Sequence, residues 1–316
     1  MKNKISIGLI GYGNIGKKRL EALNQMKKIA DVKVICDKFK IRKRFSSIKI
    51  INKLKKIDDF KLDLIIICTP TYVSKKIYTK FVGRYHLLIE KPITLDQNSL
   101  LNSIKKSNEK KKIIMAGYNL KFDIGLNYIK KKLITKSIGK IYHCSISYAN
   151  GTAKTNTNKI GSIFDMASHS INLVMWLFES KNLKVLKSFN QYNEFSKKTS
   201  DNGYAIIKIK KILINLHHGF CNWKNNFQLE IHGSKGSLKV NSLPKWSEQT
   251  ILLEKRTLPS GLPKIKIKRF NVDLSFRKEL EYLVKNISNI KKLKLKKIAE
   301  LNYESFNTLK NSSLLK

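Results

Sequence analysis

The glycine-rich segment Gly11–Gly16, with the sequence GYGNIG, constrains the fold of this chain more than any other feature. It fits the pattern G-x-G-x-x-G directly after the apolar run Ile5–Ile10 and directly before the amphipathic stretch Ile15–Ile29. By itself this spacing also fits a glycine turn that binds nothing. A strand before it and a helix after it are typical of a parallel α/β sheet that binds a dinucleotide.

Each residue of this loop has an expected task. Gly11 permits the tight turn, Gly13 lets the backbone approach a pyrophosphate, and Gly16 lets the helix pack against the strand. The helix that begins near Asn14 and Ile15 presents N–H groups and the positive end of its dipole to the phosphates. We therefore predict cofactor contacts at these five positions.

The residue after the second predicted strand helps to select the cofactor. Asp37 follows the glycines by about 20 residues, the spacing at which a carboxylate accepts hydrogen bonds from ribose hydroxyls. Because a carboxylate there repels a 2′-phosphate, it favours NAD. Lys38 and the basic segment Lys40–Arg44 would instead attract that phosphate, so NADP stays open.

Apolar runs and amphipathic stretches alternate in the first third of the chain, which predicts parallel strands covered by helices on both faces. The predicted strands are Ile5–Ile10, Val32–Cys36, Ile48–Ile51, Leu64–Cys68, Leu87–Ile89 and Ile113–Ala116. The predicted helices are Ile15–Ile29, Tyr72–Val82 and Gln97–Asn108, the last with Asp96 as its N-cap. Residues 1–121 are therefore predicted to form a doubly wound Rossmann domain.

The pattern changes after a predicted helix at Ile124–Ile134 to short strand-like runs separated by turns. These strands are Ile141–Tyr148, Val185–Phe189, Ala205–Ile209, Ile212–His217, Phe227–His232, Ser237–Val240 and Ile265–Phe270. Further helices are expected at Phe164–Phe178, Leu274–Ile287 and Ile298–Leu309. Residues 122–316 are therefore predicted to form an α+β domain with a mostly antiparallel open sheet.

Two polar motifs follow strands of the predicted parallel sheet at its carboxyl edge, where such sheets bind ligands. Glu90-Lys91-Pro92 follows the fifth strand, and the proline holds Lys91 in an extended conformation. Thr69-Pro70 follows the fourth strand, where it either closes over the cofactor or only stiffens the strand exit. We predict cofactor contacts from Thr69, Pro70, Glu90 and Lys91.

Asp165 and His169 lie four residues apart on a predicted helix, a spacing that places both on one face. The helix is largely apolar, and a buried carboxylate and imidazole are costly unless they are paired or functional. The pattern fits a satisfied structural pair as well as it fits a catalytic pair.

Composition argues against several other classes of protein. The formal charge is +42, yet the lysines run through every segment and no nucleic-acid motif accompanies them, so no specific nucleic-acid partner is expected. No apolar run approaches the ~18 residues of a membrane span, and the glycine-interrupted N-terminus does not fit a signal peptide. We therefore expect a cytoplasmic protein.

Cys36, Cys68, Cys144 and Cys221 lack metal-site spacing and are predicted to be small buried hydrophobes, with no metal.

Taken together, these motifs show that the chain resembles the Gfo/Idh/MocA oxidoreductases, a family named after glucose–fructose oxidoreductase and inositol dehydrogenase. The resemblance runs over almost the whole length. Its hallmarks are Gly11–Gly16, Asp37, Cys68-Thr69-Pro70, Glu90-Lys91-Pro92, Gly117–Phe122, Asp165 with His169, and the hairpin Leu229–Leu238.

The resemblance implies an NAD(P)-dependent dehydrogenase that transfers a hydride between the nicotinamide and a secondary alcohol of a sugar or cyclic polyol. Lys91 would hydrogen-bond the reacting hydroxyl, His169 would act as general base, and Asp165 would orient the imidazole or contact the substrate. Asn119 and Lys121 would also bind the substrate. The open sheet commonly forms the oligomer interface in this family, which implies a homodimer or homotetramer.

Some positions depart from the family pattern and concern the substrate. Many relatives carry a second aspartate where this chain has Asn172, and an arginine where it has Lys121. The Tyr118-Asn119 form resembles members encoded with bacterial surface-polysaccharide genes, which implies a sugar, an amino sugar or a nucleotide-linked sugar. Trp223 would either stack on a sugar ring or fill the core.

Two other functions stay open at this point. Some relatives, including some glycosidases, use tightly held NAD for transient oxidation, so that no net NADH forms. A non-enzymatic dinucleotide sensor would carry the same glycine loop, but it needs none of Lys91, Asp165 and His169.

Overall fold

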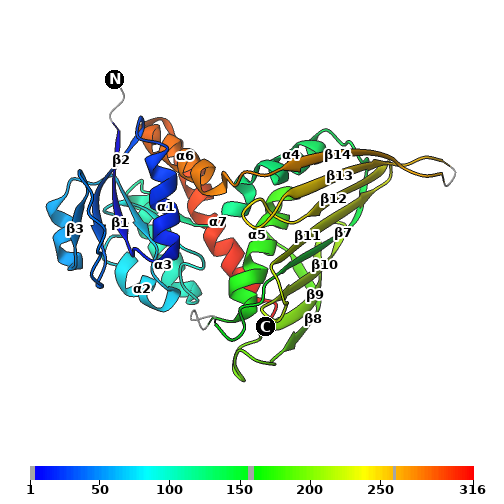
Figure 1. The fold of residues 1–316 in the computed structure, drawn as a ribbon, viewed down its shortest axis with the longest axis horizontal. Coiled ribbons are helices and arrows are strands. Elements are labelled where there is room, and N and C mark those ends of the chain that lie inside the picture. The colour runs from blue at the N-terminus through cyan, green and yellow to red at the C-terminus, as the bar shows by residue number, and fades with distance from the viewer. Residues whose placement is uncertain (1–3, 156–159, 259–260) are drawn as a thin grey trace. The chain divides into compact units, whose positions relative to one another are not determined.

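The computed structural model describes residues 4–155, 160–258 and 261–316. The chain forms two compact units, one from residues up to 119 together with 276–306, and one from residues 120–275 together with 307–316. Each unit contains one β-sheet (Figure 1). The predicted division after residue 121 lies close to the observed division after residue 119.

The first unit contains a six-stranded parallel sheet in the order β3-β2-β1-β4-β5-β6. The strands are β1 (Ile5–Ile10), β2 (Ala30–Cys36), β3 (Lys49–Ile51), β4 (Leu64–Ile67), β5 (His86–Ile89) and β6 (Ile114–Ala116). All residues of β4 and β5 are buried, as expected for strands that are covered on both faces. This is the strand order of a doubly wound dinucleotide-binding fold, so the Rossmann prediction is confirmed.

Helices cover this sheet. They are α1 (Asn14–Asn24), η1 (Leu54–Asp59), α2 (Thr71–Tyr78), α3 (Gln97–Glu109), α6 (Ser275–Ser288), η4 (Ile290–Lys292) and α7 (Leu295–Ser313). Leu20 and Leu23 of α1 share one apolar core with Leu280 and Leu283 of α6 and with side chains of β1, β2 and β4. Helix α2 contacts β4 and β5 with residues outside that core.

The positions of α6 and α7 correct the predicted extent of the second domain, which was expected to include everything after residue 121. Residues 276–306 fold with the first unit instead. Strand β6 lies at the edge of the parallel sheet, and α7 satisfies its backbone: Ile114 N donates to Asn302 Oδ1 (2.8 Å) and Ala116 N donates to Ser305 Oγ (3.0 Å). The helix therefore covers a sheet edge whose N–H groups would otherwise be unpaired.

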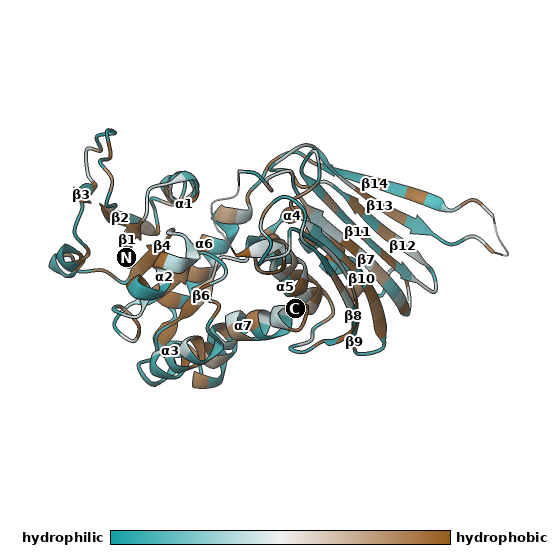
Figure 2. Ribbon diagram, turned by 90° about the horizontal axis from the view of Figure 1, so that it is seen from below, coloured by the Kyte–Doolittle hydropathy of each residue, from teal (hydrophilic) through white to brown (hydrophobic). Residues whose placement is uncertain are grey.

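The second unit contains an eight-stranded sheet in the order β14-β13-β12-β11-β7-β10-β9-β8, in which only β7 and β10 pair in parallel. The strands are β7 (Ile141–Ala149), β8 (Lys184–Gln191), β9 (Asn202–Ile209), β10 (Ile212–Gly219), β11 (Asn226–Gly233), β12 (Gly236–Asn241), β13 (Gln249–Lys255) and β14 (Lys264–Phe270). Several strands change between hydrophobic and hydrophilic along their length (Figure 2), and buried residues alternate with less buried ones along β9. The predicted mostly antiparallel open sheet is confirmed.

Strand β13 was not predicted from the sequence. Its burial alternates, but one of its inward positions is the polar Gln249 and one outward position is the apolar Leu252, so the apolar pattern does not show the period of two. Helices η2 (Asn119–Phe122), α4 (Ile124–Ile134) and α5 (Ser168–Leu177) belong to the same half of the chain as this sheet.

The helix predicted at Phe164–Phe178 is divided. Ile163–Ala167 forms a π-helical segment, η3, and α5 continues from Ser168 to Leu177. α5 and η3 contact β7 on one face of the sheet (Figure 1), and the other face stays open. Short π-helical segments of this kind are frequent at functional sites.

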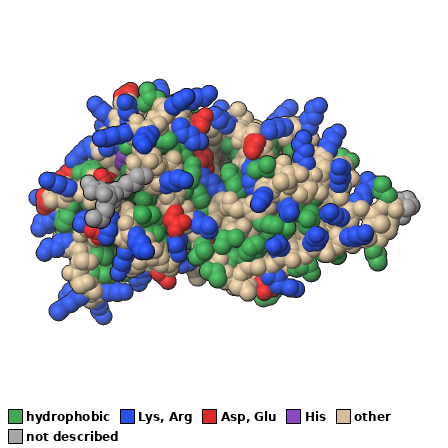
Figure 3. Space-filling model, turned by 90° about the horizontal axis from the view of Figure 1, so that it is seen from above, with side chains coloured by type: hydrophobic (Ala, Val, Ile, Leu, Met, Phe, Trp, Pro, Cys, Tyr) green, Lys and Arg blue, Asp and Glu red, His purple; other side chains and the backbone are tan. Residues whose placement is uncertain are grey.

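The burial of the cysteines and of Trp223 agrees only partly with the predictions from the sequence. Cys36 and Cys144 are buried as predicted, but Cys68 is only partly buried and Cys221 is exposed. Trp223 is 87% exposed and therefore does not fill the core. Lys and Arg side chains are scattered over the face shown in Figure 3. Among the described residues, no helix is long and apolar enough to cross a membrane.

Candidate functional site

The glycine loop has the conformation that a dinucleotide site requires. Gly11 has φ = +89°, and a Cβ there would lie 3.0 Å from the carbonyl of Cys68. A Cβ at Gly16 would overlap the Gly11 carbonyl oxygen, so this position brings α1 close to β1. By contrast, a Cβ at Gly13 would meet no described atom within 4 Å. The loop is therefore packed at its two ends and open in the middle, where a phosphate needs to approach.

Helix α1 begins at this opening. Asn14 is its first residue, and the N-cap Gly13 has no side chain with which to cap the first N–H groups. These N–H groups and the helix dipole can therefore serve an anion. This geometry is compatible with a pyrophosphate, and cofactor contacts from Gly11, Gly13, Asn14, Ile15 and Gly16 remain a prediction.

The side chain of Asp37 is fixed at the end of β2 by the backbone. Asp37 Oδ2 accepts a hydrogen bond from Tyr12 N (2.6 Å) and Oδ1 accepts one from Phe39 N (2.9 Å). Asp37 thus joins the glycine loop to the end of β2, a contact that the local sequence does not reveal. Lys38 beside it is exposed, with Nζ 4.6 Å from the centroid of the Phe39 ring.

Glu90 at the end of β5 takes part in a buried charge cluster. Arg19 of α1 is fully buried and donates from Nε (2.9 Å) and Nη2 (2.8 Å) to Glu90 Oε1, and from Nη1 to Glu279 of α6. The two carboxylates raise the pKa of Arg19 against the opposing effect of burial. Neither Arg19 nor Glu279 was predicted, because nothing in the local sequence marks them as partners. Glu90 anchors the strand end directly before Lys91.

Thr69 and Lys91 follow neighbouring strands. Thr69 Oγ1 lies 3.0 Å from Ser74 Oγ, which donates to Thr69 O (2.9 Å), and Pro70 is the N-cap residue of α2. The side chain of Lys91 is partly exposed, and its peptide bond to Pro92 is cis. Thr69-Pro70 therefore at least shapes the exit from β4.

The sheet order brings the predicted cofactor residues of the first unit to one edge. β2, β1, β4 and β5 are neighbours, and they end at Cys36, Ile10, Ile67 and Ile89. Asp37, the glycine loop, Thr69-Pro70 and Glu90-Lys91 therefore all follow the carboxyl edge of one parallel sheet, where ligands of this fold bind.

Asp165 and His169 belong to the second unit. Asp165 lies on η3 and is partly exposed, whereas His169 lies in the first turn of α5 and is 7% exposed. The Tyr148 ring of β7 stands edge-on to the His169 ring, with centroids 5.4 Å apart and an interplanar angle of 80°. His169 is therefore positioned by packing against the sheet.

Asn119 ends the first segment of the first unit, whereas Lys121 and Asn172 belong to the second unit. Asn119 is buried and Lys121 is partly buried, with Nζ 5.2 Å from the centroid of the Phe122 ring. Asn172 is buried, and its Nδ2 donates to Thr308 Oγ1 of α7 (3.0 Å). Asn172 therefore links α5 to α7.

A buried histidine supports the start of η3. His218 Nδ1 lies 2.9 Å from Ser162 Oγ, which donates to Ser200 O (3.0 Å). Burial, with a smaller effect from His217, lowers the pKa of His218 to about 3, so its imidazole is neutral at pH 7. It therefore joins β10 to the residue before η3.

An aromatic and cationic cluster that the sequence did not reveal lies beside His169. Lys245 Nζ donates to Tyr148 Oη (2.9 Å), and the Trp246 ring stacks on the Tyr148 ring at 5.7 Å. In the local sequence, only the adjacent residues Lys245 and Trp246 hint at this cluster, because their partner Tyr148 lies 97 residues away along the chain. In the part of the chain that the structure describes, no three His, Cys, Asp or Glu side chains gather as metal ligands would.

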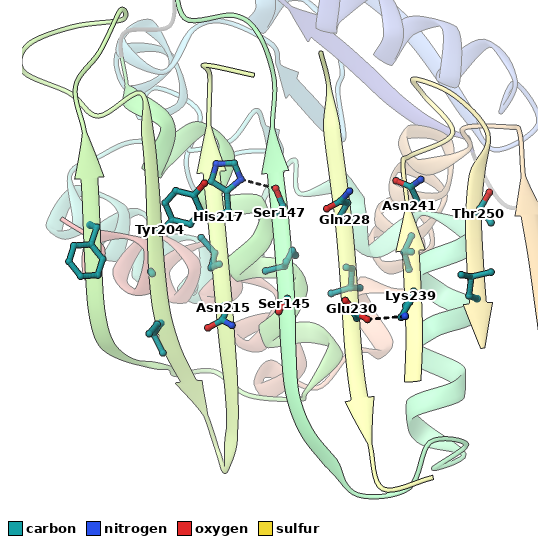
Figure 4. A pocket seen from close by; sticks show the side chains of 18 residues that line it. Ser145, Ser147, Tyr204, Asn215, His217, Gln228, Glu230, Lys239, Asn241 and Thr250 are labelled. Atoms are coloured by element: carbon teal, nitrogen blue, oxygen red, sulfur yellow. Dashed lines mark hydrogen bonds and ion pairs between the residues drawn. The ribbon is translucent and has the colours of Figure 1, made fainter. Parts of the chain in front are cut away.

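The open face of the large sheet carries a separate hollow of about 730 Å³. Ser147, His217, Gln228 and Glu230 contribute to it from neighbouring strands, as Figure 4 shows. This face is opposite to His169, because Tyr148, the next residue after Ser147, points toward the helices.

The parallel sheet, the glycine loop and the polar groups at its carboxyl edge define an oxidoreductase-type domain that binds a nicotinamide dinucleotide. Residues 5–118 match the family described as "Oxidoreductase family, NAD-binding Rossmann fold", and residues 126–239 match the "GFO/IDH/MocA C-terminal domain". The chain therefore belongs to the Gfo/Idh/MocA family, and the resemblance in its sequence is confirmed. It is an NAD(P)-dependent dehydrogenase of that family.

Individual relatives are distant. The chain is 23% identical over 260 residues to inositol 2-dehydrogenase of Rhizobium meliloti (strain 1021), which covers 75% of this chain and 76% of that protein. It is 23% identical over 261 residues to glucose-6-phosphate 3-dehydrogenase of Bacillus subtilis (strain 168), covering 75% and 74%. A variant of KijD10, a 3-ketoreductase from Actinomadura kijaniata in complex with TDP-benzene and NADP, has the same fold, with a TM-score of 0.80, 15% identity and coverage of 99% and 97%.

Proposed function

We propose that this dehydrogenase oxidises a secondary alcohol of a sugar or cyclic polyol, or reduces the corresponding ketone. The observation that carries the proposal is Lys91, a cation placed at the carboxyl edge of the sheet by the anchored strand end at Glu90. Two relatives are named as dehydrogenases of inositol and of glucose 6-phosphate, and this supports a sugar or cyclic polyol as the substrate.

Each residue contributes a separate step of the chemistry. Gly11, Gly13 and the first turn of α1 would hold the pyrophosphate, and Asp37 would accept hydrogen bonds from a ribose. The nicotinamide, when bound, accepts or supplies the hydride. In the oxidation, Lys91 donates a hydrogen bond to the reacting oxygen and stabilises the negative charge that develops there. His169 takes the hydroxyl proton, and Asp165 orients the imidazole or contacts the substrate.

Turnover by variants tests this assignment. We expect Lys91→Ala and His169→Ala to lower kcat/KM by at least about 100-fold, the usual contribution of general acid–base catalysis, on whichever sugar the wild type oxidises. The assay follows absorbance at 340 nm with NAD and NADP against a panel of polyols, sugars and nucleotide sugars. Lys76→Ala, which removes an exposed lysine of α2, is the matched control.

Binding of the cofactor separates loss of chemistry from loss of the fold. His169→Ala should bind NADH as tightly as the wild type, because the glycine loop and Asp37 are unchanged. If both variants turn over the sugar at the wild-type rate, the catalytic roles of Lys91 and His169 are wrong. Cofactor that survives dialysis, without a substrate-dependent change in absorbance, would support transient oxidation instead.

We also propose the cofactor and the oligomeric state. Asp37 leads us to favour NAD, with NADP as the alternative because of Lys38. The open face of the eight-stranded sheet, with its exposed Leu186, Phe189 and Tyr204, supports a homodimer or homotetramer. A cytoplasmic location and the absence of a specific nucleic-acid partner remain predictions from the sequence.

A further inference from the structure

Lys245 is a cation that aromatic groups hold in one place. It lies between β12 and β13, with Nζ 2.9 Å from Tyr148 Oη, 4.5 Å from the centroid of the Trp246 ring and 5.4 Å from the centroid of the Tyr148 ring. Tyr148 is 4% exposed and packs on Phe227 as well as on Trp246. The ammonium group therefore has a fixed position beside a buried ring.

The loop that carries Lys245 is itself braced. Trp246 N (2.9 Å) and Ser247 N (3.2 Å) donate to the carbonyl of Leu243, whose side chain is buried. Ser242 Oγ lies 2.6 Å from Ser247 Oγ. Because both ends of this short turn are tied together, the backbone that carries Lys245 is held in one conformation.

The charge of Lys245 has no negative partner in the part of the second unit that the structure describes. Its Nζ contacts a tyrosine hydroxyl and two aromatic faces, and no carboxylate oxygen of a described residue lies within 4 Å. A hydroxyl uses only one of the three donors of an ammonium group. A half-buried cation with two donors left over is a suitable partner for an anion, because charge-assisted hydrogen bonds are the strongest that side chains make.

The same tyrosine ring contacts the proposed general base. The Tyr148 ring forms a T-shaped pair with the His169 ring, and its hydroxyl accepts a hydrogen bond from the ammonium of Lys245. We propose that Lys245 is a specificity-determining residue that binds an oxyanion, a phosphate or a carboxylate, attached to the sugar whose hydroxyl reacts at His169. The location of the reacting hydroxyl rests on the proposed function; the anion site itself does not.

Ligand binding without turnover tests the inference. Dissociation constants are measured by isothermal titration calorimetry for glucose, glucose 6-phosphate and glucuronate, each with the full-length protein saturated with NADH. We expect wild type to bind at least one anionic sugar about 10- to 100-fold more tightly than glucose, which is the range that one hydrogen bond to a charged group contributes. Lys245→Met should abolish this difference and leave the affinity for glucose unchanged.

Two further variants make the outcome specific. Lys245→Arg keeps the charge and should retain most of the preference. Lys211→Met removes an exposed lysine at the turn between β9 and β10, and should have no effect. A preference for phosphate alone identifies a phosphate monoester as the source, whereas preference for both anionic sugars indicates oxyanions in general.

Two results would overturn the inference: wild-type protein with no preference for an anionic sugar, or a preference that persists in Lys245→Met. Neither depends on hydride transfer. If instead the anion preference behaves as expected but Lys91→Ala and His169→Ala turn over sugars normally, only the catalytic assignment fails.

Discussion

Asp37 has two tasks that one substitution can separate. Its oxygens accept hydrogen bonds from the backbone of Tyr12 and Phe39, and its charge disfavours a 2′-phosphate. Asp37→Asn keeps one acceptor oxygen and removes the charge. We expect the ratio of kcat/KM for NADP to that for NAD to increase about tenfold, since about 1.4 kcal/mol of differential binding corresponds to that factor.

Substitution of Lys38, the residue after Asp37, is the control for cofactor choice, because it removes a positive charge where Asp37→Asn removes a negative one. Lys38→Met removes the exposed cation that follows Asp37 in the sequence and should shift the same ratio toward NAD. A ratio that is unchanged in Asp37→Asn would show that this carboxylate only braces the loop. Steady-state kinetics with both cofactors and one substrate decide between the two roles.

At the scale of residues, the sequence predicts those site positions whose neighbours along the chain carry the signal. Gly11, Gly13 and Gly16 lie within one loop, and Lys91 is marked by the proline after it. Arg19 and Glu279, by contrast, meet across 260 positions of the chain. Because such a contact depends on how α1 and α6 pack, no local pattern could reveal it.

Arg19 of α1 connects the end of β5 to α6 through two carboxylates, so its substitution should destabilise the packing of all three elements. Arg19→Met would leave the carboxylates of Glu90 and Glu279 without their common partner, one of them in the core. Breaking a buried ion pair from one side costs about 3–5 kcal/mol, so we expect a loss of stability of that order. Urea denaturation monitored by circular dichroism measures it.

The matched control for Arg19 removes all three charges. Arg19→Met combined with Glu90→Gln and Glu279→Gln should regain much of the lost stability, because no uncompensated charge remains. We expect the activity of both the single and the triple variant to be lower than that of the wild type, because both lose the hydrogen bonds between Arg19 and Glu90 that hold the strand end before Lys91. Equal stability of the single and triple variants would contradict this account.

At the scale of elements, the presence of helices was more predictable than their packing partners, although the helix predicted at Ile15–Ile29 already ends at Asn24. The periodicity of α6 is local, and its predicted and observed ranges differ by one residue at each end. Its packing against α1 was missed, as was the role of α7 in covering the edge of β6. β13 was missed because its inward Gln249 is satisfied by a distant residue, Asp123, to which Gln249 Nε2 donates (3.1 Å).

At the scale of the whole molecule, two buried histidines should make stability depend on pH. Burial lowers the pKa of His218 to about 3, and burial with Lys112 lowers that of His86 to about 4. Both lie below the unfolded value near 6.5, so the unfolded chain binds more protons in this window. Stability from these groups is therefore complete above pH 6.5 and is lost as the pH falls toward 4.

The slope of stability against pH tests this effect. Each histidine contributes up to about 1.4 kcal/mol per pH unit between pH 6 and 4.5. His218→Gln and His86→Gln should each make the slope shallower by up to that amount, whatever they do to stability at pH 7. Urea denaturation at several pH values gives the slopes, and variants with the wild-type slope would show that these imidazoles are protonated in the folded protein.

The open face of the eight-stranded sheet should determine the oligomeric state. Leu186, Phe189, Tyr204, Ile206 and Leu213 are exposed on β8, β9 and β10, and a single sheet rarely leaves so many apolar side chains in water. A second copy that covers this face would remove them from solvent. Tyr204→Lys should therefore convert the proposed dimer or tetramer into a smaller species, as measured by light scattering after size exclusion. Leu262→Lys changes an apolar residue that is 92% exposed outside this face, and it should leave the mass unchanged. A wild-type monomer, or an oligomer that Tyr204→Lys does not weaken, would mean that this face is not an interface between copies.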